Sequence, residues 1–340
     1  MIKLAQIGVG YWGPNLLRNF YFLKDAIVKK VIDIDPGRRE YVRQNYKSVN
    51  TGEDIAEVLE DKDIDAVIIA TPAGLHYEMA KRVLLSGKHC LVEKPLALRS
   101  DEARELSSIA CERKLVLMVG HVFLYNTAVN DLRNRILKGD FGRIYYIYSQ
   151  RLNLGKVRTD VNVLWNLVPH DVSIVIYLLG KSPVSVSAAG MSFIQKDIED
   201  VVFMILKFED GTVAHFHVSW LDPNKTRMMT IIGSRKMIIY DDISEYKIKI
   251  FDKGIDTEGK DKYLGEFDNF GKFQLIKRAG DIYIPKIEYA EPLKLEATHF
   301  IDCIKNRKKP RSDGENGLIV TKIIESAMQS LKDKSTEVII

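Results

Sequence analysis

The chain has 340 residues, a formal net charge of +4 and 46% hydrophobic residues. This composition is typical of a globular protein with one large domain or two, and it excludes a low-complexity chain. Lysines and acids alternate along the sequence, and the one basic cluster, residues 305–311, has no aromatic side chains beside it. We therefore expect no nucleic-acid partner.

The cysteines and the apolar runs indicate the compartment. Cys90, Cys111 and Cys303 are isolated and odd in number, so neither a disulfide framework nor a zinc ribbon is predicted. Met1 leads directly into the first predicted strand, which argues against a signal peptide. No apolar run approaches the length of a membrane span. We expect a cytoplasmic protein without a membrane partner.

The first predicted elements are a strand, a glycine-rich turn and a helix. Residues 2–7 form an apolar run typical of a buried parallel strand, and Pro14 suits the first turn of a helix. The turn between them has the G-x-G-x-x-G spacing of a dinucleotide site, in which the glycines allow a tight turn, close approach to a pyrophosphate and close helix packing. Unpaired N–H groups at the start of the helix would bind the phosphates. The cofactor-binding residues predicted here are Gly8, Gly10, Tyr11, Trp12 and Gly13.

A carboxylate follows at the spacing that such a site requires. A second strand over residues 27–32 ends in Asp33, twenty residues after Gly13. This side chain could accept hydrogen bonds from an adenosine ribose. Its charge favours NAD because it would repel the 2′-phosphate of NADP, although Arg38 and Arg39 leave NADP open.

Strand and helix patterns alternate as far as residue 120. Such a βαβ series predicts a doubly wound parallel sheet, the Rossmann type of α/β fold, over residues 1–120. Ligands on these sheets bind at the carboxyl ends of the strands, so we expect Thr71, Pro72 and the sequence Glu93-Lys94-Pro95 near the reacting end of the cofactor. Further strands are predicted over 66–70, 89–92 and 115–119, and helices over 38–46, 54–59 and 101–113, the last capped by Ser100. Another helix is predicted to carry Met79, Val83 and Leu84 and to end at Gly87.

The pattern changes beyond residue 121. Consecutive strands without crossover helices indicate an antiparallel or mixed sheet that can leave one face open for a ligand or a partner subunit. We therefore expect a second α/β domain over 121–340, with a homodimer or homotetramer formed through the open face. Residues 252–290 give no clear pattern. Strands are predicted over 144–152, 226–232, 237–240, 246–251 and 337–340, a hairpin over 200–220, and helices over 127–138, 165–179, 293–305 and 317–331.

Two side chains could transfer a proton. Lys94 follows a strand end, and partial burial would lower its pKa, although a surface lysine is the alternative. His170 can exchange a proton near neutral pH, and Asn166 lies one helical turn before it on the same face. A core or capping histidine is the alternative there. His215 and His217 alternate along one strand but lack a third ligand, so no metal site is predicted.

Taken together, these motifs resemble the glucose–fructose oxidoreductase/inositol dehydrogenase (Gfo/Idh/MocA) family. The resemblance implies a Rossmann domain followed by an α/β domain with a large, mostly antiparallel sheet. It also implies hydride transfer between NAD(P) and a hydroxyl of a sugar, a cyclitol or a nucleotide-linked sugar. Lys94 matches the lysine of the family's E-K-P motif and His170 the histidine of its D-x-x-x-H motif. The resemblance is carried by the Gly8–Gly13 turn, Ala70-Thr71-Pro72 with His76, Glu93-Lys94-Pro95, Gly120-His121, His170-Asp171, Glu296 to Phe300 and Arg311-Ser312-Asp313-Gly314.

Asn166 departs from the pattern, because many inositol and glucose dehydrogenases of the family have Asp at this position. An amide cannot act as a base or carry a negative charge. With Trp165 before it, Asn166 resembles the branch that acts on nucleotide-linked sugars. We therefore expect oxidation at C3 of a hexose of the UDP-N-acetylglucosamine type, in which Lys94 or His170 takes the proton and Asn166 orients the substrate. The alternatives are a 3-ketosugar reductase, an inositol or free-sugar dehydrogenase, and a sensor that binds NAD without turnover.

Overall fold

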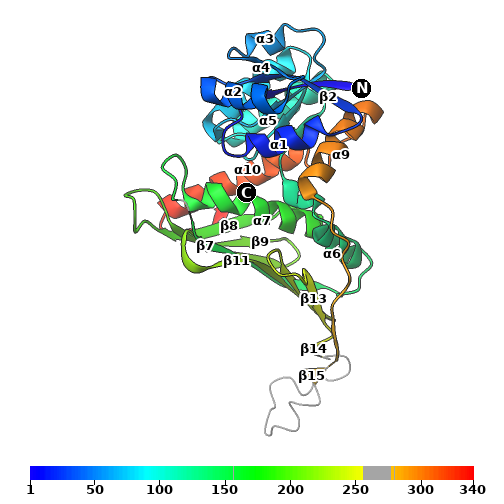
Figure 1. The fold of residues 1–340 in the computed structure, drawn as a ribbon. Helices are drawn as coiled ribbons and strands as arrows, with labels where there is room; N and C mark the ends of the chain where they lie inside the picture. The colour runs from blue at the N-terminus through cyan, green and yellow to red at the C-terminus, as the bar shows by residue number, and fades with distance from the viewer. Residues whose placement is uncertain (156, 256–276, 279) are drawn as a thin grey trace, which may run out of the picture. The chain divides into compact units, whose positions relative to one another are not determined.

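The computed structural model describes residues 1–155, 157–255, 277–278 and 280–340, and it divides the chain into two compact units (Figure 1). The first unit contains Met1–Asn126 and Ala290–Glu325, and the second contains Thr127–Tyr289 and Ser326–Ile340. The unit built on the first sheet therefore includes a late segment of the chain. The domain boundary expected between residues 120 and 121 stays a prediction.

The first unit is built on a six-stranded parallel sheet with the strand order β3-β2-β1-β4-β5-β6. This is the order of a doubly wound dinucleotide-binding sheet, which confirms the predicted fold class. Every residue of β4 is buried, which explains its continuous apolar sequence. The strands are β1 (Ile2–Ile7), β2 (Ala26–Ile32), β3 (Asn50–Gly52), β4 (Ala66–Ile69), β5 (His89–Val92) and β6 (Leu117–Val119).

Helices cover this sheet. Phe20 and Phe300 meet edge to face between α1 and α9, with ring centroids 6.2 Å apart. The prediction that Ser100 caps α5 was wrong: the helix begins at Ser100 itself, and the Ser100 N–H donates to the Glu325 carboxylate at 3.3 Å. The helices that belong wholly to this unit are α1 (Gly13–Tyr21), α2 (Pro36–Asn45), α3 (Ala56–Leu59), α4 (His76–Leu85), α5 (Ser100–Glu112) and α9 (Pro292–Asn306), with short 3₁₀ turns η1 (Ala73–Leu75) and η2 (Val122–Tyr125).

The second unit is built on a nine-stranded sheet with the order β16-β13-β12-β11-β7-β10-β9-β8-β17. Its pairs are antiparallel except β7 with β10, and the predicted hairpin is present as β9 and β10. The large, mostly antiparallel sheet is therefore confirmed. The strands are β7 (Ile144–Leu154), β8 (Ser185–Met191), β9 (Val201–Lys207), β10 (Val213–Ser219), β11 (Leu221–Gly233), β12 (Met237–Asp241), β13 (Ile248–Phe251), β16 (Ile282–Tyr283) and β17 (Val338–Ile339).

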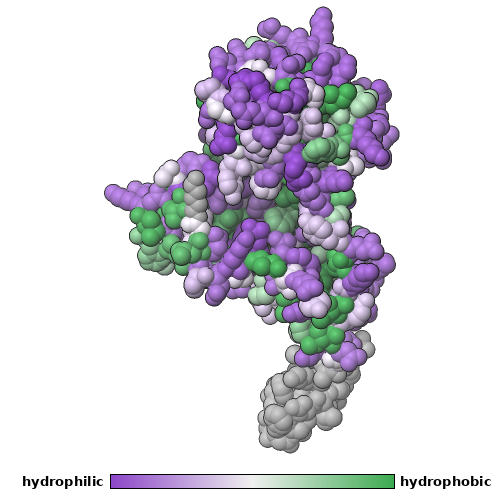
Figure 2. Space-filling view, in the orientation of Figure 1, coloured by the Kyte–Doolittle hydropathy of each residue, from purple (hydrophilic) through white to green (hydrophobic). Residues whose placement is uncertain are grey.

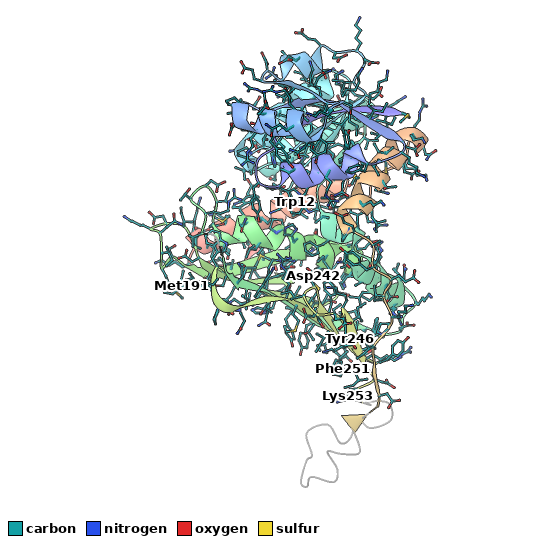
Figure 3. All side chains as sticks on the ribbon, viewed as in Figure 1. Trp12, Met191, Asp242, Tyr246, Phe251 and Lys253 are labelled. Atoms are coloured by element: carbon teal, nitrogen blue, oxygen red, sulfur yellow. The ribbon has the colours of Figure 1, made fainter. Side chains whose placement is uncertain are left out.

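One face of the second sheet is covered by α7 (Val163–Leu179), which follows α6 (Thr127–Leu137) in the chain (Figure 1). Burial alternates along β9 because successive side chains point to opposite faces, and Phe203 and Ile205 remain exposed on the face away from the helix. Figure 3 labels Met191, the last residue of β8, and Phe251, the last residue of β13, on opposite sides of this unit. Apolar patches are visible on the surface of the second unit in Figure 2.

Three segments complete the fold. Helix α10 (Gly314–Lys332) spans the boundary between the segments assigned to the two units, and β14 (Gly254–Ile255) pairs with β15 (Lys277–Arg278). The stretch 252–290, which the sequence left unassigned, falls largely outside the described residues. Among the described helices, none combines the length and the apolar character needed to span a membrane.

Candidate functional site

The turn between β1 and α1 has the backbone geometry of a phosphate site. Gly8 has φ +92°, and a Cβ there would lie 2.6 Å from the Ala70 carbonyl oxygen. A Cβ at Gly13 would lie 2.6 Å from the Gly8 carbonyl oxygen, whereas one at Gly10 would meet nothing within 4 Å. The first and third glycines are therefore required by packing, and the second leaves the backbone open. Among the described residues no side chain caps α1, so the positive end of the helix dipole is available to an anion.

Gln6 holds this turn from inside the sheet. Its fully buried amide donates to the carbonyls of Gly8 and Gly13, each at 2.9 Å. The sequence analysis did not assign it a role. The available signal was a polar residue in a buried strand, because a buried amide needs hydrogen-bond partners.

The Asp33 carboxylate joins the end of β2 to the same turn. It accepts hydrogen bonds from the N–H groups of Val9 at 2.7 Å and Asp35 at 2.9 Å. This is the position where a ribose binds in such folds. Arg39 donates to the Asp33 carbonyl at 2.7 Å and pairs with Glu53 at 3.2 Å. The guanidinium nearest to Asp33 is thus already bound within the protein.

The sequence Glu93-Lys94-Pro95 follows β5 directly, and the Lys94–Pro95 peptide bond is cis. The Glu93 carboxylate accepts the Lys94 N–H at 3.2 Å and a hydrogen bond from the Trp12 side chain. Burial raises the pKa of Glu93 to about 7. A Cβ at Gly120 would lie 3.0 Å from this carboxylate, so the glycine makes room for it. Glu93 therefore connects the motif that contains Lys94 to the glycine turn.

His76 connects the loops that follow β4 and β5. Its Nδ1 lies 2.6 Å from the Pro95 carbonyl oxygen and its Nε2 lies 2.9 Å from the Thr71 carbonyl oxygen. Burial lowers the pKa of His76, and a neutral imidazole donates to one carbonyl at a time. The residue thus holds together two loops that carry predicted cofactor residues.

Two more buried polar side chains belong to this unit. Within the described residues, neither the Glu296 carboxyl oxygens nor the His121 ring nitrogens have a hydrogen-bond partner. Burial, with the nearby Glu93 charge, raises the pKa of Glu296 well above its usual range. Burial, with the nearby Lys94 charge, lowers the pKa of His121 to about 3. The His121 imidazole is therefore neutral at neutral pH.

In the second unit, α7 carries Asn166 and His170 one turn apart. The next residue, Asp171, forms a bidentate ion pair with Arg151 of β7, with N–O distances of 2.7 to 3.2 Å. Both side chains are buried, at 7% and 5% exposed. The Trp220 indole N–H donates to Asn166 Oδ1 at 3.2 Å. Neither Arg151 nor Trp220 was predicted to have a role, because their partners are distant in sequence.

The structure brings together the predicted cofactor residues in the first unit, and it places Asn166 and His170 in the second. The roles of these residues stay predictions. Among the described residues, no group of three or more His, Cys, Asp or Glu side chains could hold a metal ion. His217 stacks on Phe203, with ring centroids 4.4 Å apart.

A parallel sheet in this strand order, with an open glycine turn and a carboxylate after β2, defines a dinucleotide-binding protein. Two family profiles match the chain: "Oxidoreductase family, NAD-binding Rossmann fold" over residues 2–121 and "GFO/IDH/MocA C-terminal domain" over residues 129–239. The chain belongs to the Gfo/Idh/MocA family of oxidoreductases, and its first unit is an NAD-binding Rossmann domain. This membership confirms two expectations from the sequence: NAD as the cofactor and an oxidoreductase as the class of enzyme.

Individual relatives differ in substrate. The chain is 32% identical over 196 residues to UDP-N-acetylglucosamine 3-dehydrogenase of Acidithiobacillus ferrooxidans, which covers 57% of this chain but only 61% of that enzyme. It is 27% identical to scyllo-inositol 2-dehydrogenase (NAD(+)) of Bacillus subtilis, over 91% of this chain and 88% of that one. The solved structure of the Acidithiobacillus enzyme superposes with a TM-score of 0.82 at 25% identity and 98% coverage of each chain.

Proposed function

We propose that the protein is an NAD-dependent dehydrogenase that oxidises the 3-hydroxyl of a nucleotide-linked hexose of the UDP-N-acetylglucosamine type. The observation that carries this proposal is the amide at Asn166, one turn before His170. It replaces the acid found in many free-sugar enzymes of the family, and an amide can orient a substrate without acting as a base. The similarity to a UDP-N-acetylglucosamine 3-dehydrogenase supports the same substrate.

The residues of the first unit suit NAD. The open backbone at Gly10 and the N–H groups of α1 would hold the pyrophosphate, and Asp33 would accept hydrogen bonds from the ribose. Because Asp33 would repel a 2′-phosphate and Arg39 is bound to Glu53, we expect NAD rather than NADP. When bound, the nicotinamide accepts the hydride.

Proton transfer is the task of the protein. Lys94 or His170 takes the proton of the hydroxyl as the hydride leaves its carbon, and Asn166 orients the sugar. Run in reverse, the same groups would reduce a 3-keto sugar. The Glu93 carboxylate holds the Lys94 backbone through the Lys94 N–H.

The test is a substrate panel with the purified protein and NAD, in which NADH formation is followed by absorbance. The panel contains UDP-, dTDP- and GDP-linked hexoses, free hexoses, and scyllo- and myo-inositol, the last two because the inositol dehydrogenase match covers most of the chain. We expect kcat/KM to be at least about a hundredfold higher for one nucleotide sugar than for any inositol. Deuterium at C3 of that sugar should slow turnover.

Two outcomes would contradict the proposal. Highest kcat/KM with an inositol or a free sugar would make the protein a dehydrogenase of that substrate. Tight NAD binding without reduction by any member of the panel would support the NAD-binding sensor. A 3-keto nucleotide sugar with NADH tests the reductase direction in the same assay.

We also propose that the protein forms a homodimer or homotetramer through the open face of the second sheet. Tyr146 of β7 and Phe203 and Ile205 of β9 are 45%, 42% and 38% exposed on the two strands that flank β10, and exposed apolar sheet surface is usually covered. Phe203→Glu should reduce the mass measured by sedimentation, with Leu137→Glu as the control, because Leu137 is exposed at the end of α6 and lies outside the sheet. A monomeric wild-type protein would contradict this proposal.

A further inference from the structure

The hydrogen bond between Trp220 and Asn166 fixes the orientation of the Asn166 amide. The indole nitrogen lies 3.2 Å from Oδ1, and Trp220 is 2% exposed. An indole N–H can only donate, so its partner must be the oxygen of the amide. The Asn166 NH₂ group therefore lies on the opposite side of the amide carbon from Oδ1.

Trp220 is held rigidly. It lies between the last residue of β10 and the first residue of β11. Its backbone N–H donates to the Asp200 carbonyl at 3.0 Å, and its carbonyl accepts the Gly155 N–H at 3.2 Å. The indole is thus fixed by backbone hydrogen bonds as well as by burial.

The segment Glu199-Asp200, which binds the Trp220 backbone through Asp200, also anchors the first turn of α7. The helix cap residue Asn162 accepts the Trp165 N–H at 3.1 Å and donates to the Glu199 carboxylate at 2.6 Å. The backbone of Asn166 donates to the Asn162 carbonyl at 3.1 Å. Glu199 and Asp200 are adjacent, so the first turn of α7 and the indole share one anchor.

We propose that Trp220 is a positioning residue that turns the NH₂ group of Asn166 toward the substrate, an inference that rests on the proposed function. The NH₂ group can only donate hydrogen bonds, so the group that it binds on the substrate must be an acceptor oxygen. We assign this oxygen to the reacting carbon, C3 of the sugar. There the donors stabilise the negative charge that develops on the oxygen as its proton leaves. A carboxylate at the same position would accept hydrogen bonds or a proton instead of donating to this oxygen.

The kinetic test uses Trp220→Phe, which keeps an aromatic ring and removes the N–H donor. We expect kcat to fall about ten- to a hundredfold, because a misplaced orienting group slows the chemical step. KM and the Kd for NAD should change by less than about threefold, since Trp220 belongs to the second unit and acts on the sugar through Asn166. In an Asn166→Ala background, Trp220→Phe should lower kcat no further.

Tyr177→Phe is the matched control. It also removes one aromatic donor that holds α7, here a 2.7 Å hydrogen bond to Asn130. Tyr177 lies eleven residues beyond Asn166, about 16 Å along the helix. We expect a comparable loss of stability with wild-type kcat. An equal fall of kcat for Trp220→Phe in the wild-type and Asn166→Ala backgrounds would overturn the inference.

A second measurement needs no substrate. In ¹⁵N-labelled protein, the Trp220 indole proton should exchange slowly with solvent in the wild type and in Asn166→Asp, because both side chains offer an oxygen. It should exchange faster in Asn166→Leu. Unchanged exchange in Asn166→Leu would overturn the inference even if the protein turns over a sugar. Absence of turnover on every sugar would contradict the proposed function instead, and indole exchange would still decide whether Trp220 orients Asn166.

Discussion

The two units hold their functional side chains in different ways. In the first, the glycine turn is fixed by its own backbone and by Gln6, which is two residues from Gly8 and seven from Gly13. In the second, Asn166 is held by Trp220, 54 residues later in the chain, and Asp171 by Arg151, 20 residues earlier. Short-range contacts of Gln6 fix the glycine turn itself, whereas contacts between residues distant in sequence hold the helix that carries Asn166 and His170. The second region should therefore be more sensitive to the loss of single side chains.

The largest expected effect is at the buried ion pair of the second unit. Arg151→Met leaves the Asp171 carboxylate buried without its cation, so the free energy of unfolding should fall by about 3–5 kcal/mol. Arg151→Met with Asp171→Leu should regain most of that loss, because no buried charge remains. Urea unfolding measures both values. If Arg151→Met lowers the free energy of unfolding by less than about 1 kcal/mol, the second unit is not more sensitive than the first to the loss of a single side chain.

Glu93 gives the corresponding test in the first unit. Burial raises its pKa in the folded protein to about 7, so between pH 4.5 and 7 the folded state binds more protons than the unfolded state. Wild-type stability should therefore fall over this range relative to Glu93→Gln, by up to about 3 kcal/mol, and the difference should be constant at higher pH. Urea unfolding of both proteins at several pH values measures it. A difference that stays constant below pH 7 would show that Glu93 is not buried.

Two glycine substitutions in the turn should affect different properties, one the stability of the fold and the other the affinity for NAD. Gly13→Ala places a methyl group against the Gly8 carbonyl, so stability should fall by about 1–3 kcal/mol. Gly10→Ala should change stability by less than about 0.5 kcal/mol, because the space is open. It should still weaken NAD binding at least about tenfold, since the methyl group takes the place of the pyrophosphate. Calorimetry measures the Kd, and wild-type affinity in Gly10→Ala would contradict the assigned phosphate site.

The smallest expected effects are at two helix caps, one in each unit. Asn162 caps α7, and Asp35 caps α2 by accepting the Gly37 N–H at 2.7 Å. Replacement of either by Ala should lower the free energy of unfolding by about 1 kcal/mol. Only Asn162→Ala should also lower kcat, because it loosens the first turn of α7. Equal kcat values in the two variants would contradict this difference.

The same contrast explains which parts of the fold were predictable. Apolar runs identified β1 and β5 with their bounds, and the alternating pattern identified the hairpin of β9 and β10. Outside the unassigned stretch 252–290, two of the described strands were missed. β3 has three residues and no apolar run, and β8 consists largely of small residues, Ser-Val-Ser-Ala-Ala-Gly-Met. Neither has a periodic signal, because both depend on their neighbours in the sheet.

The candidate site follows the same rule. The glycines and Asp33 were found because their spacing in the sequence reflects one βαβ unit. Trp220 and the pair of Arg151 with Asp171 were not found, because only the folded sheet brings those residues to α7. Gln6 lies between these cases, since its polarity within a buried strand was visible but its two partners were not.

The most direct test of the central claim is the turnover of Lys94→Ala and of His170→Ala with NAD and the best nucleotide sugar, with the Kd for NAD measured on the same preparations. If one of these side chains takes the proton, kcat should fall at least about a hundredfold in at least one of the two variants while NAD still binds. Wild-type kcat in both variants would contradict the account.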